Sequence, residues 1–194
     1  MLNSYNFDQL ENDPQNYYYY SEGFDKKELQ KIDKGVKKIP LNKATTVGGP
    51  EDVRKSKIRW IPQNTEWVWL YEKLAGYVEE ANKALWKFDL YTLPEKIQFT
   101  EYHSIDKGHY DWHQDIGPNI LSKRKISITV QLSGPDDYEG GVLEMWSGGN
   151  NIITAHKGRG SVFIFPSYMM HRVTPVTKGV RKSFVLWVGG SHYR

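Results

Sequence analysis

Cysteine is absent from this sequence of 194 residues. Without thiols the chain can form no disulfide, no thiolate nucleophile and no sulfur-ligated metal site, so any metal must be held by histidine, aspartate or glutamate. A large excess of one charge is also missing. The 26 Lys and Arg residues against 23 Asp and Glu leave a net charge of +3, which argues against a dedicated nucleic-acid-binding protein.

Long apolar segments are missing as well. No run approaches the length that crosses a bilayer, and residues 1–10 lack the basic start and apolar stretch of a secretory signal. Hydrophobic residues at 39% and aromatic residues at 14% are nevertheless sufficient for a core. We therefore expect a cytoplasmic protein with no membrane partner, folded as a single domain over residues 1–194.

Basic residues are concentrated between residues 25 and 59. Eleven Lys or Arg residues stand there against five Asp or Glu residues, a local surplus of six positive charges. Such a segment either guides an anionic partner or forms a solvated face of the protein. The sequence leaves both interpretations open.

Two segments of the first half have the periodicity of amphipathic helices. Asp25 with Glu28 three positions later predicts a capping-box start, and Gly35 and Pro40 predict the end of that helix. A second helix is predicted by a stripe of apolar side chains at helical spacing. The stripe consists of Trp67, Leu70, Leu74, Val78, Ala81 and Leu85. The tyrosine run 17–20 predicts an N-terminal strand, so residues 1–96 are expected to support the rest of the domain.

From residue 97 onward, short apolar or alternating runs are separated by turn-forming clusters. The predicted strands are Ile97–His103, Lys125–Leu132, Val142–Trp146, Ile152–His156, Ser161–Pro166 and Lys182–Val188. Regularly spaced short strands after a helical start indicate a mostly β fold with supporting helices, an α+β protein with a jelly-roll core over residues 97–190. Within 125–132 apolar and polar residues alternate, so the polar face of that strand is either solvated or lines a wet cavity.

His113 and Asp115 are separated by one residue and can therefore point to the same face of an extended strand. His171 lies far downstream, just after a strongly apolar strand, which suits a ligand on a distant strand of the same barrel. Two imidazoles and one carboxylate form the facial triad of non-haem Fe(II) oxygenases, which leaves three coordination positions open. Zinc would accept the same three ligands, so the triad alone does not select the metal.

Arg181 follows His171 across the turn-forming residues 177–179. We expect a hairpin at that turn, which would place Arg181 on the strand next to His171. A guanidinium can hold a carboxylate through two parallel charge-assisted hydrogen bonds. A pocket with both a chelatable metal and this arginine has the shape required by 2-oxoglutarate, whose keto acid would bind the metal and whose distal carboxylate would bind Arg181.

These positions carry a resemblance to a known family. The matching motifs are Tyr102, Gly108, Tyr110, His113 and Asp115, then Gly140-Gly141-Val142-Leu143, Phe165-Pro166, His171-Arg172-Val173-Thr174-Pro175-Val176, Gly179 and Arg181. Together they resemble the prolyl 4-hydroxylase-like Fe(II)/2-oxoglutarate-dependent dioxygenases over residues 97–189. Prolyl hydroxylases commonly have a lysine where this chain has Arg181, so the sequence looks more similar to a bacterial or viral subgroup.

The resemblance implies a double-stranded β-helix, a cupin-like jelly roll, with His113, Asp115 and His171 as iron ligands. It implies Fe(II), 2-oxoglutarate and dioxygen as cofactor and co-substrates, and it allows ascorbate. Arg181 would bind the distal carboxylate of 2-oxoglutarate, and Tyr102 would support the same co-substrate; each also has a plain structural interpretation as a strand residue. Two further strand residues are weaker candidates: Thr129 as another hydrogen-bond donor to the co-substrate and Trp187 as a wall of the pocket.

The implied reaction couples oxidation of 2-oxoglutarate to succinate and carbon dioxide with hydroxylation of an unactivated C–H bond. The family favours a prolyl residue of a peptide or protein as substrate, with Tyr110 as a further candidate for the substrate pocket. The segments 44–57 and 115–123 flank the expected mouth and either close over a peptide or are ordinary surface loops. A free amino acid or another small molecule stays an alternative, and so does a non-catalytic metal-binding jelly-roll domain.

Overall fold

The predicted capping box starts helix α1 (Lys26–Val36). The side chain of Asp25 accepts a hydrogen bond from the backbone N–H of Glu28, and the Glu28 carboxylate accepts one from the backbone N–H of Asp25, each at 2.8 Å. Leu29, Ile32 and Val36 are buried on one face of the helix. The predicted first helix is therefore confirmed at both its start and its apolar face.

The second predicted helix is α2 (Val68–Ala81), which continues into a π-helical turn, η2 (Asn82–Trp86). The apolar stripe of the sequence is buried along its length, except that Leu85 is half-buried. The computed structural model describes residues 16–44 and 51–191. Among these residues no helix is both long enough and apolar enough to cross a membrane.

The strands form a nine-stranded major sheet and a five-stranded minor sheet. The major sheet has the order β1 (Tyr18–Tyr20), β12 (Val162–Pro166), β8 (Arg124–Gln131), β14 (Val176–Gly190), β6 (Gln98–His103), β4 (Lys57–Trp60) and β2 (Asn42–Lys43), and β5 (Leu90–Thr92) and β9 (Tyr138–Gly140) also pair with β14. The minor sheet has the order β11 (Ile152–Thr154), β10 (Leu143–Trp146), β13 (His171–Val173), β7 (His109–His113) and β3 (Arg54–Lys55). Short 3₁₀ turns occur at η1 (Glu51–Val53), η3 (Ser104–Asp106) and η4 (Asn119–Lys123).

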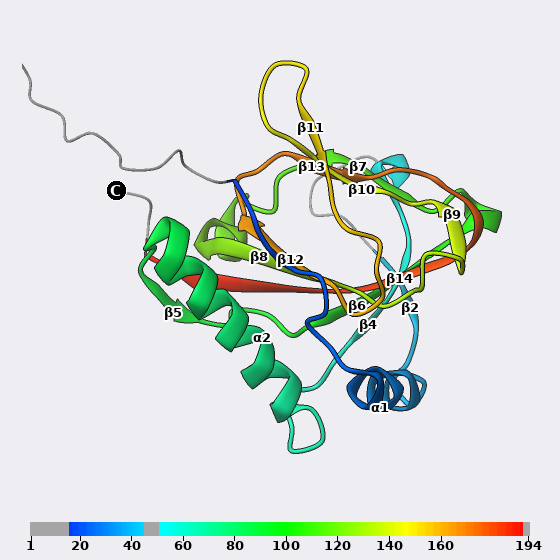
Figure 1. The fold of residues 1–194 in the computed structure, drawn as a ribbon, viewed down its shortest axis with the longest axis horizontal. Helices are drawn as coiled ribbons and strands as arrows, with labels where there is room; N and C mark the ends of the chain where they lie inside the picture. The colour runs from blue at the N-terminus through cyan, green and yellow to red at the C-terminus, as the bar shows by residue number, and fades with distance from the viewer. Residues whose placement is uncertain (1–15, 45–50, 192–194) are drawn as a thin grey trace, which may run out of the picture.

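The elements lie in three layers, with the helices on one face of the major sheet and the minor sheet on the other face (Figure 1). One apolar core fills the space between the helices and the major sheet, and a second, smaller core lies between the two sheets. This arrangement is the predicted mostly β jelly roll with supporting helices.

Side chains of strand β8 point alternately to the core beneath the helices and to the interior between the two sheets. Ile126, Ile128 and Val130 belong to the core beneath the helices. The alternate residues Ser127 and Thr129 point to the other face and are buried as well. Of the two readings that the sequence left open, the polar face therefore lines the interior between the sheets rather than the solvent.

The expected hairpin between His171 and Arg181 is absent. Residues 176–190 are one continuous strand, β14, which pairs first with β9 and then with β6 and β8. Gly179 lies in this strand with φ +69° at the point where the pairing changes. Arg181 consequently lies in the major sheet and His171 in the minor sheet, so the two residues come from opposite sheets and not from neighbouring strands.

The first half of the chain contributes more strands than the sequence predicted. The tyrosine run forms the expected strand β1, but β2, β4 and β5 also join the major sheet and β3 extends the minor sheet. These strands have two to four residues, too few for a periodicity to be visible in the sequence.

Replacing Gly179 with alanine should destabilise the protein. A Cβ at this positive φ would collide with the carbonyl oxygen of Asp137, and we expect a loss of about 1–3 kcal/mol in the free energy of unfolding. Gly76 is the matched control, because its Cβ would meet nothing within 4 Å inside α2; Gly76→Ala should stabilise the protein by about 0.5–1 kcal/mol. Urea unfolding measures the free energy of unfolding of both variants. If both substitutions change it in the same direction, the positive φ of Gly179 is not the reason for its effect.

Candidate metal centre

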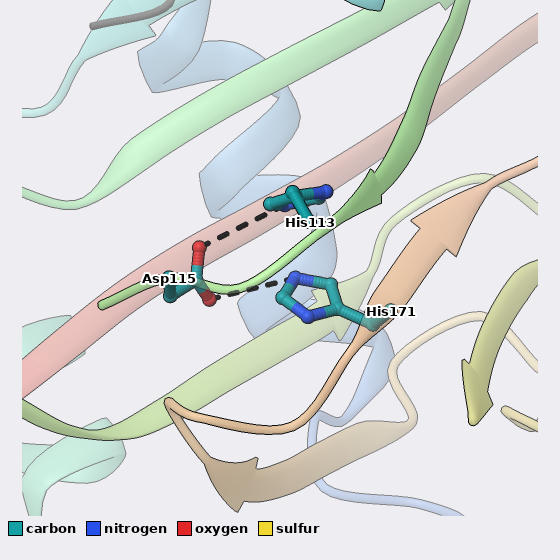
Figure 2. A group of neighbouring side chains, drawn as sticks. All are labelled: His113, Asp115 and His171. Atoms are coloured by element: carbon teal, nitrogen blue, oxygen red, sulfur yellow. Dashed lines mark ion pairs between the residues drawn. The ribbon is translucent and has the colours of Figure 1, made fainter. Parts of the chain in front are cut away.

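Three predicted ligands converge from two elements. His113 ends strand β7 and lies directly opposite His171 of the antiparallel strand β13, while Asp115 follows β7 by two residues. The Nε2 atoms of His113 and His171 lie 3.9 and 3.5 Å from the two carboxylate oxygens of Asp115, as Figure 2 shows. One ligand atom from each residue lies within 4.8 Å of the others. The structure thus brings together the triad that the sequence only suggested.

The backbone fixes the tautomers of both histidines. Nδ1 of His113 lies 2.7 Å from the carbonyl oxygen of Asp111, and Nδ1 of His171 lies 2.8 Å from that of Met169. Because a carbonyl can only accept, each Nδ1 carries the proton and each Nε2 presents its lone pair toward Asp115. Two such lone pairs beside a carboxylate match the donor set of a divalent metal, so the residues fit the ion that the triad implies.

The Asp115 carboxylate is held by neighbours from strand β8. Ser127 donates a hydrogen bond of 2.6 Å to Oδ2 of Asp115. Arg124 donates one of 3.1 Å to the Asp115 carbonyl oxygen and approaches Oδ1 to 3.9 Å. The same guanidinium is fixed by two hydrogen bonds to Glu95, of 2.6 and 2.5 Å, and by stacking on the Trp187 ring at 3.6 Å. The aspartate is therefore positioned before any metal binds.

The charges of the cluster follow from its burial. Burial lowers the pKa of His113 to about 3; His171 reinforces this effect, and Asp115 opposes it. Burial acts to raise the pKa of Asp115, but the two histidines, Arg124 and Ser127 together outweigh it and hold that pKa below its usual range. At neutral pH the site consequently contains a neutral imidazole at His113 and a carboxylate, the protonation states in which these groups bind metal.

Arg181 lines the same pocket as the triad. It is only 4% exposed, and its one hydrogen bond to a side chain among the described residues is a long contact of 3.4 Å to Ser183. Within residues 16–44 and 51–191 no carboxylate lies within ion-pair distance of Arg181. A buried guanidinium without an anionic partner fits a bound carboxylate, which is what 2-oxoglutarate would provide.

The other predicted site residues also line this pocket: Tyr102, Tyr110, Thr129 and Trp187. Tyr110 stacks on the His113 ring with 3.4 Å between the centroids. Thr129 donates its hydroxyl proton to the Phe184 carbonyl at 3.0 Å, so the predicted donation to a co-substrate would require this bond to break. The buried indole N–H of Trp187 has no hydrogen-bond partner within the part of the chain that the structure describes.

Sequence reasoning missed several residues of the site. Ser127 could have been found, because it is on the polar face of the alternating strand. Arg54 and Gln98 also line the pocket and are joined by a hydrogen bond of 2.6 Å. No pattern in the sequence links Arg54 to Gln98 or Glu95 to Arg124, since each pair meets only through the fold.

Comparison with known proteins shows a similarity to one family of enzymes. The model of the 2OG-Fe(II) oxygenase superfamily matches residues 97–189, the segment that contains the triad and Arg181. Residues 97–189 are therefore similar to the 2OG-Fe(II) oxygenase superfamily. The name of that superfamily refers to Fe(II) and 2-oxoglutarate, the metal and the co-substrate that the sequence led us to expect.

Individual relatives are consistent with this similarity. A PKHD-type hydroxylase of Teredinibacter turnerae is 38% identical over 103 residues, which cover 50% of this chain and 45% of that protein. A PKHD-type hydroxylase of Rippkaea orientalis is 29% identical over 168 residues, 83% of this chain and 72% of that protein. The chain spans about half or less of the length of most curated relatives that it matches.

The fold is that of a prolyl hydroxylase. The prolyl hydroxylase of Trichoplax adhaerens, solved with a peptide fragment of the hypoxia inducible factor oxygen degradation domain, superimposes with a TM-score of 0.75. The superposition covers 90% of this chain and 84% of that chain at 17% identity. The double-stranded β-helix expected from the sequence is thereby confirmed.

Acidification should destabilise the metal-free protein. In the unfolded chain His113 regains a pKa near 6.5. Below that pH the unfolded state therefore binds a proton that the folded state excludes, and the free energy of unfolding decreases as the pH is lowered. From this residue alone we expect a loss of about 2 kcal/mol between pH 7 and pH 5. Urea unfolding in the presence of a chelator at both pH values measures it. His113→Gln should lose correspondingly less stability over the same pH range. If this variant has the same pH dependence as the wild-type protein, the lowered pKa of His113 is refuted.

Proposed function

We propose that the protein is an Fe(II)- and 2-oxoglutarate-dependent dioxygenase that hydroxylates a prolyl residue of a peptide or protein. The proposal rests on one observation: two imidazole nitrogens and a carboxylate meet in a pocket that also contains a buried arginine. The metal ligands and the anion site of a 2OG-Fe(II) oxygenase are both required for the reaction, and a domain that only binds a metal has no need of the arginine.

In this proposal His113, Asp115 and His171 hold the iron from one side. Three protein ligands would leave coordination positions open for the keto acid and dioxygen. Bound iron and 2-oxoglutarate would supply the oxidising chemistry, with succinate and carbon dioxide as by-products. The chain itself would supply position, since no side chain has to act as a nucleophile or general base.

Arg181 binds the distal carboxylate of 2-oxoglutarate in this scheme. Its place on the major sheet, across the pocket from His171 on the minor sheet, suits a ligand that bridges the two sheets. Phe165, Val173 and Val185 form apolar walls of the same pocket and would exclude water from the reacting groups. Tyr102 lies beside the guanidinium, with its ring centroid at 5.7 Å, and is proposed to support the same co-substrate.

The choice of a peptide substrate is supported by the relatives. The Trichoplax enzyme was solved with a peptide, and the curated relatives are named as PKHD-type hydroxylases. Tyr110 and Arg54 lie at the outer side of the cluster, where Arg54 stacks over the Tyr110 ring at 4.8 Å. These two side chains are proposed to contact the substrate, and Trp187 is proposed to close the inner wall.

Turnover should depend on Asp115. With Fe(II), 2-oxoglutarate and proline-containing peptides, we expect succinate to form and the peptide to gain one oxygen atom in mass spectrometry. Asp115→Ala should abolish both signals and weaken Co(II) binding, measured by tryptophan fluorescence quenching, because the three-ligand site loses its one charged ligand and keeps only the two histidines. Wild-type protein that binds metal but never consumes 2-oxoglutarate would favour the non-catalytic metal-binding domain instead.

Arg181→Ala should separate the two requirements. Loss of a bidentate charge-assisted contact of about 2–3 kcal/mol would raise the KM for 2-oxoglutarate by roughly 30-fold or more, with little effect on metal affinity. The matched control is Arg172→Ala, on the same strand as His171 but ion-paired to Glu144 at 2.7 Å and half-exposed. Arg172→Ala should keep the wild-type KM for 2-oxoglutarate. If Arg181→Ala weakens metal binding and 2-oxoglutarate binding equally, Arg181 does not bind the distal carboxylate.

A further inference from the structure

A groove of about 600 Å³ lies outside the metal pocket, along strands β2, β3, β4 and β6. Arg54 lines both the groove and the pocket of the triad. Its guanidinium lies over the Tyr110 ring, which in turn stacks on His113. Arg54 therefore borders both the groove and the candidate metal centre, so an extended polymer that passes Arg54 could contact both.

The carboxylates of this groove are mostly neutralised. Glu101 lies 3.8 Å from Arg59 and 3.0 Å from His103. Asp52 lies 3.6 Å from Lys55. Of the acidic side chains in the lining that the structure describes, Asp106 alone lacks an ion-pair partner among the described residues.

The cations of the groove are largely uncompensated. Lys43, Arg54 and Lys57 line it, and none of them forms an ion pair within the described residues. Arg54 donates instead to neutral partners, to Ser56 at 2.8 Å and Gln98 at 2.6 Å. Among the described lining residues, three cations without an ion pair against one carboxylate without an ion pair make the groove a site for anionic groups.

We propose that this groove binds acidic side chains of the polypeptide substrate, so that the enzyme selects target residues flanked by Asp or Glu. The inference rests on the proposed hydroxylase function and adds the substrate class. It also gives the basic surplus of residues 25–59 a role, since Lys43, Arg54 and Lys57 all belong to that segment. Of the two interpretations left open by the sequence, it favours an anionic partner over a merely solvated face.

The reach of the groove sets where the acidic residues lie. The Cα atoms of Arg54 and Lys57 are separated by at most about 11 Å of chain. An extended peptide advances about 3.3 Å per residue, so it covers this span in three or four residues. The preferred substrate should carry its acidic residues within about four positions of the hydroxylated residue.

The test uses three synthetic peptides that share one proline and differ at two positions within four residues of it. Both positions are Asp in the first peptide, Asn in the second and Lys in the third. Exposed ion pairs are individually weak, so we expect a KM for the Asp peptide about five- to tenfold below that of the Asn peptide at low salt. The Lys peptide should be poorer still. The preference should shrink in 0.5 M NaCl, roughly the range in which screening removes such contacts.

The double variant Lys43→Glu/Lys57→Gln should abolish or invert the order of the three peptides. A matched control is Lys83→Glu/Lys87→Gln, which changes the net charge by the same amount. Both residues are exposed, in and just after η2 at the end of α2, and lie away from β2 and β4 (Figure 1). The control should keep the wild-type order of peptides. A control that shifts the preference as much as the groove variant would mean that overall charge, and not the groove, is responsible.

Binding is measured separately from turnover by fluorescence anisotropy of the labelled peptides. Tight binding of the Asp peptide without hydroxylation would support the groove and overturn the proposed reaction. Hydroxylation of all three peptides with equal KM would overturn the groove and leave the reaction intact. Neither binding preference nor turnover would overturn both.

Discussion

A buried carboxylate is the constraint around which the site is built. Asp115 is 7% exposed, and burying an ion without partners would cost several kcal/mol. The fold meets that cost with the Ser127 hydroxyl and the Arg124 guanidinium. The same partners leave the Nε2 lone pairs and the carboxylate directed at one point, so the solution to a problem of solvation is also a metal-binding geometry.

The layered architecture is what makes such a polar interior tolerable. The larger apolar core lies between the helices and the major sheet, away from the site. Strands β8 and β12 present apolar side chains to that core. On its other face β8 carries Thr129 into the pocket and Ser127 to the Asp115 carboxylate. Stability therefore comes mainly from one face of the major sheet, while the opposite face is free to carry the polar groups that chemistry needs.

Local signals in the sequence predicted much of this fold. The capping box of Asp25 and Glu28 and the stripe from Trp67 to Ala81 identify the helices, because i, i+3 and i+4 contacts are written in neighbouring residues. The spacing of His113 and Asp115 gave two ligands, because side chains alternate along extended backbone. The prediction of a hairpin before Arg181 was wrong, because the positive φ of Gly179 permits strand β14 to change its pairing partners without a reversal of the chain.

By itself the sequence determined the elements and the types of side chain that could act: a cysteine-free metal site, a His-x-Asp pair, a distant histidine and an arginine. Only the tertiary structure decided that His171 faces His113 across two strands, that Arg181 approaches from the opposite sheet, and that Glu95 clamps Arg124. It also joined Arg54 to both the pocket and the outer groove. The physical reason is that strand pairing and burial depend on contacts between residues remote in the chain, and no local periodicity encodes them.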